Sequence, residues 1–266
     1  MNTIRFVAIL LFLISIFSCK TNKKEERAII EEEVEDFREI TNNVIDSSNV
    51  VIDPIKHATM ILHYDDKTIY VDPTGGATAF ENKDTPDMVL ITDIHGDHMD
   101  IETLDSLDLT NAKIVVPQAV AEKLPASYTD QLVILNNGDR QELMDITVEA
   151  IPMYNLREEA LKFHSKGRGN GYVLTLGDER FYISGDTEDI PEMRSLENID
   201  VAFVCMNLPY TMPVESAADA VLAFKPEKIY PYHYRGTEGL SDVSKFAAIV
   251  NENDADIEVV QLDWYP

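Results

Sequence analysis

The chain has 266 residues, of which 45% are apolar, so it is long enough for one or two globular domains with a sizeable core. Its 48 acidic and 22 basic residues give a net charge of -26, which argues against binding nucleic acid or coating anionic lipid, because such proteins must neutralise phosphates. Two cysteines, Cys19 and Cys205, are too few for a small disulfide-stapled secreted domain.

The first segment is typical of a targeting signal. Arg5 precedes an apolar run from Phe6 to Phe17, which is shorter than the about 20 residues that span a bilayer but has the length of a signal-peptide core. The run ends at Ser18-Cys19 and polar residues follow, an arrangement that resembles a bacterial lipobox. The resemblance implies that residues 1–18 form a lipoprotein signal peptide and that Cys19 carries a lipid. It also implies a location in the bacterial cell envelope, anchored to the membrane and facing the periplasm or the exterior.

Residues 19–49 are predicted to be an acidic tether. Eight acidic side chains lie between Glu25 and Ile40, with a thin apolar stripe at helical spacing. The polar residues 41–48 read as a linker. The folded domain is therefore expected to cover residues 50–266.

The rest of the chain alternates predicted strands with predicted helices. Short apolar runs bounded by turn residues predict strands at 58–64, 68–72, 88–92, 113–117, 132–135, 146–151, 171–176, 181–184, 201–205 and 228–232. Helices are predicted at 118–124 and 216–224. Cys205 lies inside an apolar run and is expected to be a small buried hydrophobic residue.

The strongest chemical signal follows the predicted strand at 88–92. Asp93, His95, Asp97 and His98 place four possible metal ligands within six residues, around one glycine. Imidazole and carboxylate groups bind zinc and similar divalent ions. Because neighbouring residues on a turn point in different directions, this one segment can serve two metal positions.

The run from Asp93 to His98 resembles the HxHxDH motif of the metallo-β-lactamase superfamily. Residues 184–187 resemble its segment with the bridging aspartate, and residues 232–234 its segment with the last metal histidine. Residues 57–59 and 70–73 resemble the opening hairpin of the L-ascorbate-6-phosphate lactonase-like branch. The resemblance covers residues 50–266. It implies an α/β fold of the αββα type: two mixed sheets packed face to face, with helices outside and metals at one edge.

The resemblance also implies two divalent ions. Asp93, His95 and His164 would hold the first, Asp97, His98 and His233 the second, and Asp186 would bridge both. Asp93 stands where the motif has a histidine. It is either a ligand, which leaves zinc expected but favours manganese or iron more than a histidine would, or a lost ligand that leaves one tightly bound ion. His57 is expected beside the site or in packing rather than as a ligand. His63 lies in a predicted strand and is expected to be structural.

The implied activity is hydrolysis by a metal-bridged hydroxide, with Asp97 or Asp186 orienting the hydroxide and accepting its proton. The expected partner is a small ester, lactone or phosphodiester, since the net charge disfavours long polyanions such as RNA. The candidate substrate contacts are Tyr154, Asn155, Arg168, Asn207, Tyr210 and Arg235. Two alternatives stay open: an iron-dependent oxidoreductase of the same fold, and a non-catalytic binding member. The oligomeric state also stays open.

Overall fold

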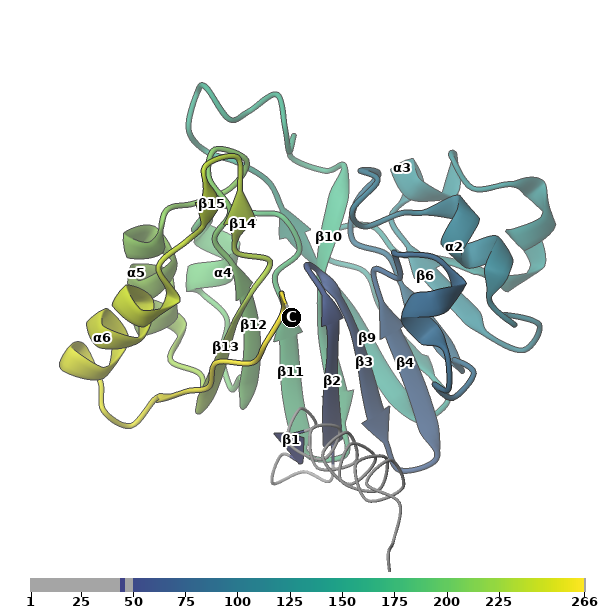
Figure 1. Ribbon diagram of the computed structural model, residues 1–266, viewed down its shortest axis with the longest axis horizontal. Helices are drawn as coiled ribbons and strands as arrows, with labels where there is room; N and C mark the ends of the chain where they lie inside the picture. Colours follow the sequence, from purple (N-terminus) through teal and green to yellow (C-terminus); the bar gives the residue numbers. More distant parts are fainter. Residues whose placement is uncertain (1–43, 46–49, 266) are drawn as a thin grey trace, which may run out of the picture. The chain divides into compact units, whose positions relative to one another are not determined.

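The computed structural model describes residues 44–45 and 50–265 (Figure 1). The predicted signal peptide, Cys19 and most of the predicted tether lie outside the described residues. Val44–Ile45 form a short strand, β1, within the segment where the sequence predicts a linker. Over the described ranges, we find no helix with the length and apolar content needed to cross a membrane.

The first sheet contains seven strands of the described chain, and they follow one another in sequence order. The strands are β1, β2 (Val50–Lys56), β3 (Thr59–Tyr64), β4 (Lys67–Val71), β5 (Met88–Leu90), β6 (Lys113–Val116) and β7 (Leu132–Ile134). Pairing is antiparallel from β1 to β4 and parallel from β4 to β7. The sheet is therefore mixed, as predicted.

The second sheet also contains seven of the described strands, in the order β16-β13-β12-β11-β10-β9-β8. Their bounds are β8 (Arg140–Leu143), β9 (Ile146–Met153), β10 (Gly169–Leu176), β11 (Glu179–Ile183), β12 (Val201–Cys205), β13 (Lys228–Tyr232) and β16 (Glu258–Val259). Pairing is parallel from β16 to β11 and antiparallel from β11 to β8.

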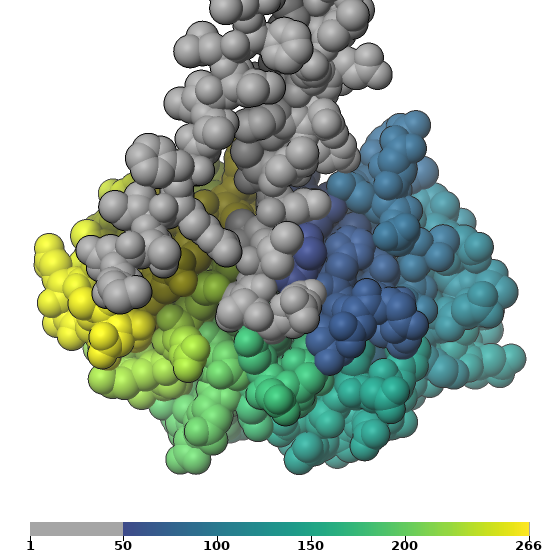
Figure 2. Space-filling model, turned by 90° about the horizontal axis from the view of Figure 1, so that it is seen from below, coloured from purple at the N-terminus to yellow at the C-terminus, as the bar shows by residue number. Residues whose placement is uncertain are grey.

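Helices cover the outer faces of the two sheets. In Figure 1, α5 and α6 lie outside β12 and β13, whereas α2 and α3 lie on the opposite side, beyond β6. The helices are α2 (Ile101–Ser106), α3 (Gln118–Ala121), α4 (Pro191–Arg194), α5 (Val214–Phe224) and α6 (Val243–Asn253), with short 3-10 turns at Ala77–Phe80 and Ala126–Gln131. From below, the yellow C-terminal segments and the blue-to-teal segments around residues 80–130 lie on opposite sides (Figure 2). This layering confirms the predicted αββα arrangement.

The continuous apolar runs of the sequence are explained by burial on both faces of the first sheet. In β5, Met88 and Leu90 join the core between the sheets, while Val89 joins a second apolar cluster that also contains Leu104 of α2. Successive side chains of a strand point to opposite faces, so a strand covered on both sides is apolar throughout.

Within residues 50–265, every predicted strand and helix overlaps an observed element of the same kind. Several elements were not predicted, among them β2, β16 and the helices α2, α4 and α6. For three further strands, the sequences show why. β8 consists mainly of exposed polar residues, and β14 (Arg235–Gly236) and β15 (Gly239–Leu240) have two residues each. Neither pattern carries a strand periodicity that can be read from sequence.

Candidate metal centre

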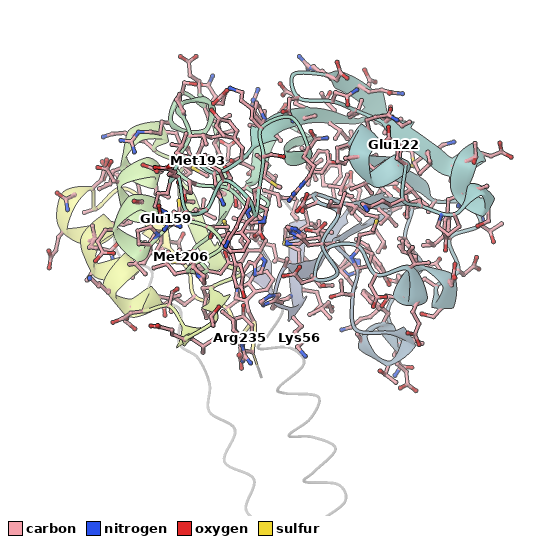
Figure 3. All side chains as sticks on the ribbon, turned by 90° about the horizontal axis from the view of Figure 1, so that it is seen from above. Lys56, Glu122, Glu159, Met193, Met206 and Arg235 are labelled. Carbon is pink, nitrogen blue, oxygen red and sulfur yellow. The ribbon has the colours of Figure 1, made fainter. Side chains whose placement is uncertain are left out.

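The predicted metal ligands come together at one edge of the two sheets. The segment from Asp93 to His98 follows β5, Asp186 follows β11 and His233 follows β13. Carboxyl ends of parallel strands meet at the same edge of a sheet and are a common place for functional groups. In the view from above, the labelled Lys56 and Arg235, which are close in sequence to His57 and His233, lie where the two halves of the molecule meet (Figure 3).

Asp186 is the centre of the site. Its Oδ2 lies 3.1 Å from His164 Nε2 and 3.3 Å from His98 Nε2, and its Oδ1 lies 3.1 Å from His233 Nε2. The carboxylate is almost fully buried, at 3% exposure. Gly185, with φ +59°, brings it there, because a Cβ atom at this position would come within 2.6 Å of Met153 Sδ.

Two of the histidines are oriented by groups behind them. His98 Nδ1 lies 2.8 Å from Asp72 Oδ2, and His164 Nδ1 lies 3.1 Å from the Tyr210 carbonyl oxygen. A carboxylate and a carbonyl can only accept, so Nδ1 carries the proton when either ring is neutral. In that form, the one a metal ion would bind, each Nε2 atom has a lone pair that faces Asp186. This arrangement is common behind metal-binding histidines. Sequence reasoning assigned Asp72 no role, although it ends the strand-like run before Pro73.

Buried polar atoms without partners indicate that the residues fit a cation. Among the described residues, His164 Nε2 and Asp186 Oδ1 are buried and have no hydrogen-bond partner. Unpaired buried polar atoms are costly, and an ion bound by lone pairs would satisfy them. The ligand atoms of His98, Asp186 and His233 lie within 4.8 Å of one another. Two imidazoles and a carboxylate, with Asp97 beside them, form a donor set suited to zinc and similar ions.

Asp186 and the histidines around it stabilise one another's charged forms. Burial alone would raise the pKa of Asp186, but His233, His98 and His164 outweigh burial and hold its pKa well below the usual range. Burial alone would lower the pKa of His98, but Asp186 and Asp72 raise it well above the usual value. Without a metal, the site therefore favours an ionised Asp186 beside a positive charge. A divalent ion can take the place of that positive charge.

His57 belongs to the site more closely than the sequence predicted. Its Nε2 lies 3.4 Å from Asp97 Oδ2, and its ring centroid lies 4.0 Å from that of His233. The ligand atoms of these three residues also lie within 4.8 Å of one another. Tyr265 holds His57 from behind, with its hydroxyl 2.8 Å from Nδ1. The contact joins residues 208 positions apart, so no local pattern could have indicated it.

Asp97 faces the open side of the site. Its side chain is 43% exposed, and Oδ2 lies 3.6 Å from His233 Nε2. Burial would raise the pKa of Asp97, but the hydrogen bond from His57 and the charges of His98 and His233 hold it far below the usual range. Asp97 therefore stays a carboxylate at neutral pH.

Asp93 lies beside His95 and His164 but is also bound by an arginine. Its Oδ2 lies 2.8 Å from His95 Nδ1 and 3.9 Å from His164 Nε2. Arg168, a predicted substrate contact, donates from Nε to Asp93 Oδ1 over 3.0 Å and from Nη2 to Oδ2 over 2.7 Å. Burial would raise the pKa of Asp93, but hydrogen bonds from His95 and Arg168 hold it below the usual range.

A cavity of about 430 Å³ opens over the ligand residues. Its lining residues are His57, His95, Asp97, Phe163, His164, Asp186, Asn207, Tyr210, Arg235, Gly236 and Thr237. Three predicted substrate contacts are among them: Asn207, Tyr210 and Arg235. The other three, Tyr154, Asn155 and Arg168, are not part of this lining.

The contacts of Tyr154 and Asn155 are structural ones. The Tyr154 hydroxyl donates to Glu192 over 2.9 Å, and Asn155 Nδ2 donates to the Tyr210 carbonyl over 2.7 Å. Asn155 therefore supports the loop behind His164 rather than the cavity. Cys205 is fully buried, and burial raises its pKa to about 12, which confirms the prediction of a buried hydrophobic residue.

Comparisons with known proteins agree with this fold. Residues 51–233 match the family model described as Beta-lactamase superfamily domain. A UPF0173 metal-dependent hydrolase from Pyrococcus horikoshii is 30% identical over 196 residues, which cover 70% of this chain and 86% of that protein.

Two solved structures are similar as well. A crystal structure described as a metal-dependent hydrolase, from Parabacteroides distasonis, has a TM-score of 0.73 and 35% identity, covering 81% of this chain and 94% of its own. Igni18, a metallo hydrolase from Ignicoccus hospitalis, has a TM-score of 0.67 and 22% identity, covering 82% and 96% of the two chains. At that identity, the second likeness supports the fold alone.

Proposed function

This chain belongs to the beta-lactamase superfamily domain family and is a metal-dependent hydrolase, and from this premise we propose that it hydrolyses a small ester, lactone or phosphodiester. The observation that carries the proposal is the convergence of three histidine Nε2 atoms on Asp186, each within 3.3 Å of a carboxylate oxygen. The site would hold a divalent ion, which, when bound, would supply the activation of water and the polarisation of an ester or phosphoryl oxygen.

The chain's own residues divide the remaining work. Asp97, His98, Asp186 and His233 would hold the ion. Asp97, ionised and half exposed at the cavity, can accept a hydrogen bond from the attacking water and orient it. His57 keeps Asp97 in place through its Nε2 atom.

The cavity lining supports a small substrate of mixed character. Phe163 and Tyr210 form an aromatic wall, with ring centroids 5.1 Å apart. Arg235 lines the same cavity and rests on the ring of Tyr265, 4.4 Å from its centroid. An arginine suits a carboxylate or phosphate group. A lactone or ester with one anionic group would place its apolar part on the wall and its charge near Arg235.

The proposal is tested by screening the purified chain against lactones, carboxylic esters and phosphodiesters. We expect hydrolysis of at least one class, its loss with a chelator, and its return with zinc or manganese. Asp186→Ala should lower the turnover by about 1,000-fold or more, because the ion loses its central ligand. Asp189→Ala is the matched control: this aspartate pairs with Arg194, outside the site, and its loss should leave turnover within about twofold.

Other outcomes would point to the alternatives. Iron in the purified protein together with substrate-dependent oxygen consumption would favour an oxidoreductase. Full activity of the Asp186→Ala variant would contradict the proposal outright.

We also propose that Cys19 anchors the protein in the cell envelope, which rests on the lipobox-like sequence alone. Mass spectrometry of the N-terminal peptide should detect a lipid on Cys19, and a Cys19→Ala variant should lose it. An unmodified Cys19 in the membrane fraction would contradict the anchor.

A further inference from the structure

The group formed by Asp93, His95 and His164 contains a feature that does not fit a metal ion. Arg168 binds Asp93 through two parallel hydrogen bonds, from Nε to Oδ1 at 3.0 Å and from Nη2 to Oδ2 at 2.7 Å. Such two-point pairing between a guanidinium and a carboxylate is strong and directional. Asp93 is fully buried, and the Arg168 side chain is only 18% exposed, so water screens this pair little.

The arginine uses the same oxygen atom that an ion would need. Oδ2 is the Asp93 atom that faces His95 Nδ1, at 2.8 Å, and His164 Nε2, at 3.9 Å. Arg168 Nη2 lies 2.7 Å from that oxygen. An ion bound to this atom would therefore lie next to the guanidinium, and the two positive charges would repel each other.

The neighbouring group has the opposite electrostatic character. In the described part of the chain, the ion pairs that Asp186 and Asp97 make within 4.0 Å are all with histidine nitrogens, and none is with an arginine or lysine. Their two negative charges are therefore available to a divalent ion. The charge of Asp93, in contrast, is already neutralised by Arg168.

The backbone holds the arginine in this position. The N–H of Asn170 donates to the Thr92 carbonyl over 2.9 Å, which ties the segment after Arg168 to the residue before Asp93. Between them, Gly169 allows a close approach, because a Cβ atom there would come within 2.8 Å of the same Thr92 oxygen. Arg168 Nη2 also donates to the Phe163 carbonyl. Moving the guanidinium away from Asp93 would also break its hydrogen bond to the Phe163 carbonyl.

We propose that Arg168 excludes a metal ion from the Asp93, His95 and His164 group, so that the chain holds one divalent ion, on Asp97, His98, Asp186 and His233. The fixed guanidinium takes the place of the second ion expected for this motif. The inference rests on the proposed function only in that the site binds a divalent ion, and it requires no particular substrate.

Zinc stoichiometry tests the proposal without any activity measurement. The full chain is stripped with a chelator, titrated with zinc chloride by calorimetry, and analysed for zinc content after gel filtration. The wild-type chain should bind one zinc ion tightly, with any second ion bound at least about 100-fold more weakly. The double variant Asp93→His/Arg168→Met, which restores a three-histidine group and removes the charge, should bind two ions.

Single variants test the charge at position 168 and the contribution of each histidine to zinc binding. Arg168→Lys keeps a positive charge and should still bind one ion. His164→Ala should leave the zinc stoichiometry at one, whereas His233→Ala should abolish tight binding. The two histidine variants keep the test informative if the double variant fails to fold.

The outcomes are distinct. Two tight zinc ions in the wild-type chain, or loss of the single tight ion in His164→Ala, would overturn the proposal. One ion without any hydrolysis would sustain this inference and count against the proposed function. Two tightly bound ions together with hydrolysis would support the proposed function and contradict this inference.

Discussion

Asp186 and Asp93 are both buried carboxylates that face imidazole nitrogens, yet their partners differ in kind. Asp186 faces His98, His164 and His233. Asp93 faces His95 and also the guanidinium of Arg168. Only the first therefore has charge to offer an ion. Residue type and spacing therefore do not define a metal site until the cations around each carboxylate are known.

The groups behind the two histidines provide the sharpest way to test this difference. Asp72 Oδ2 holds His98 Nδ1 at 2.8 Å, and Asn155 supports the Tyr210 carbonyl that holds His164. We expect Asp72→Asn to weaken zinc binding by about 10- to 100-fold, the usual effect of losing such a partner. Asn155→Ala should change zinc affinity by less than about threefold, because His164 is not a ligand of the single ion.

Competition with a chromophoric chelator measures both affinities, and urea unfolding of each metal-free variant controls for lost stability. Equal losses of zinc affinity in the two variants would show that the two halves of the site are equivalent. In that case Asp93 and Asp186 would not differ in their capacity to bind an ion.

The next effect concerns the two walls of the cavity. Arg235 follows His233, on the side of the proposed ion, whereas Tyr210 belongs to the loop that supports His164. Arg235→Met should raise KM about tenfold for an anionic substrate and little for its neutral analogue, with kcat nearly unchanged. Tyr210→Phe keeps the aromatic wall and loses only the hydroxyl bonded to Thr237, so its KM should stay within about twofold.

Steady-state kinetics on a matched pair of charged and neutral substrates measures this effect. A KM that rises equally for both substrates in Arg235→Met would show that Arg235 shapes the cavity but does not distinguish charged from neutral substrates.

The smallest expected effect is a pH dependence of the stability of the metal-free fold. It arises from the cluster around Asp186 and not from the cluster around Asp93. Neighbouring carboxylates raise the pKa of His98 above its unfolded value near 6.5, so its protonated form stabilises the metal-free fold below that pH. This stability is lost as the pH rises through the raised pKa. The lowered pKa of Asp186 adds stability above about pH 4 that is lost on further acidification.

Thermal unfolding from pH 5 to 9 checks the sign. The Tm of the metal-free chain should fall by a few degrees as the pH rises above about 6.5. The zinc-loaded chain should not show this fall, because the ion replaces the proton on His98. A metal-free Tm that stays constant or rises over this range would contradict the coupling between His98 and Asp186.

Local patterns in the sequence were enough to predict much of the fold. The apolar runs at β5, β6 and β12 predict strands because both faces of those strands are covered, and alternation is then unnecessary. The turn after β5 also indicates a metal site, because His95, Asp97 and His98 follow a buried strand within a few residues.

Long-range contacts could not be predicted in the same way. Arg168 and Asp93 are 75 residues apart, and nothing in either segment indicates that the arginine would bind the aspartate. The position of His57 likewise depends on Tyr265 and on left-handed backbone at both His57 and His233, with φ values of 62° and 45°. Such conformations persist only where tertiary contacts enforce them.

The contact between His57 and Tyr265 has a consequence for protein synthesis. The backbone N–H of His57 donates to the Trp264 carbonyl over 3.3 Å, and the ring of the same histidine contacts the Tyr265 hydroxyl. A ribosome adds these partners 207 and 208 residues after His57, which takes roughly 10 to 40 s at about 5–20 residues per second. Until then the nascent chain exposes an unfinished site, and a product that stops before Trp264 would keep every predicted metal ligand but lack the support that fixes His57 beside Asp97.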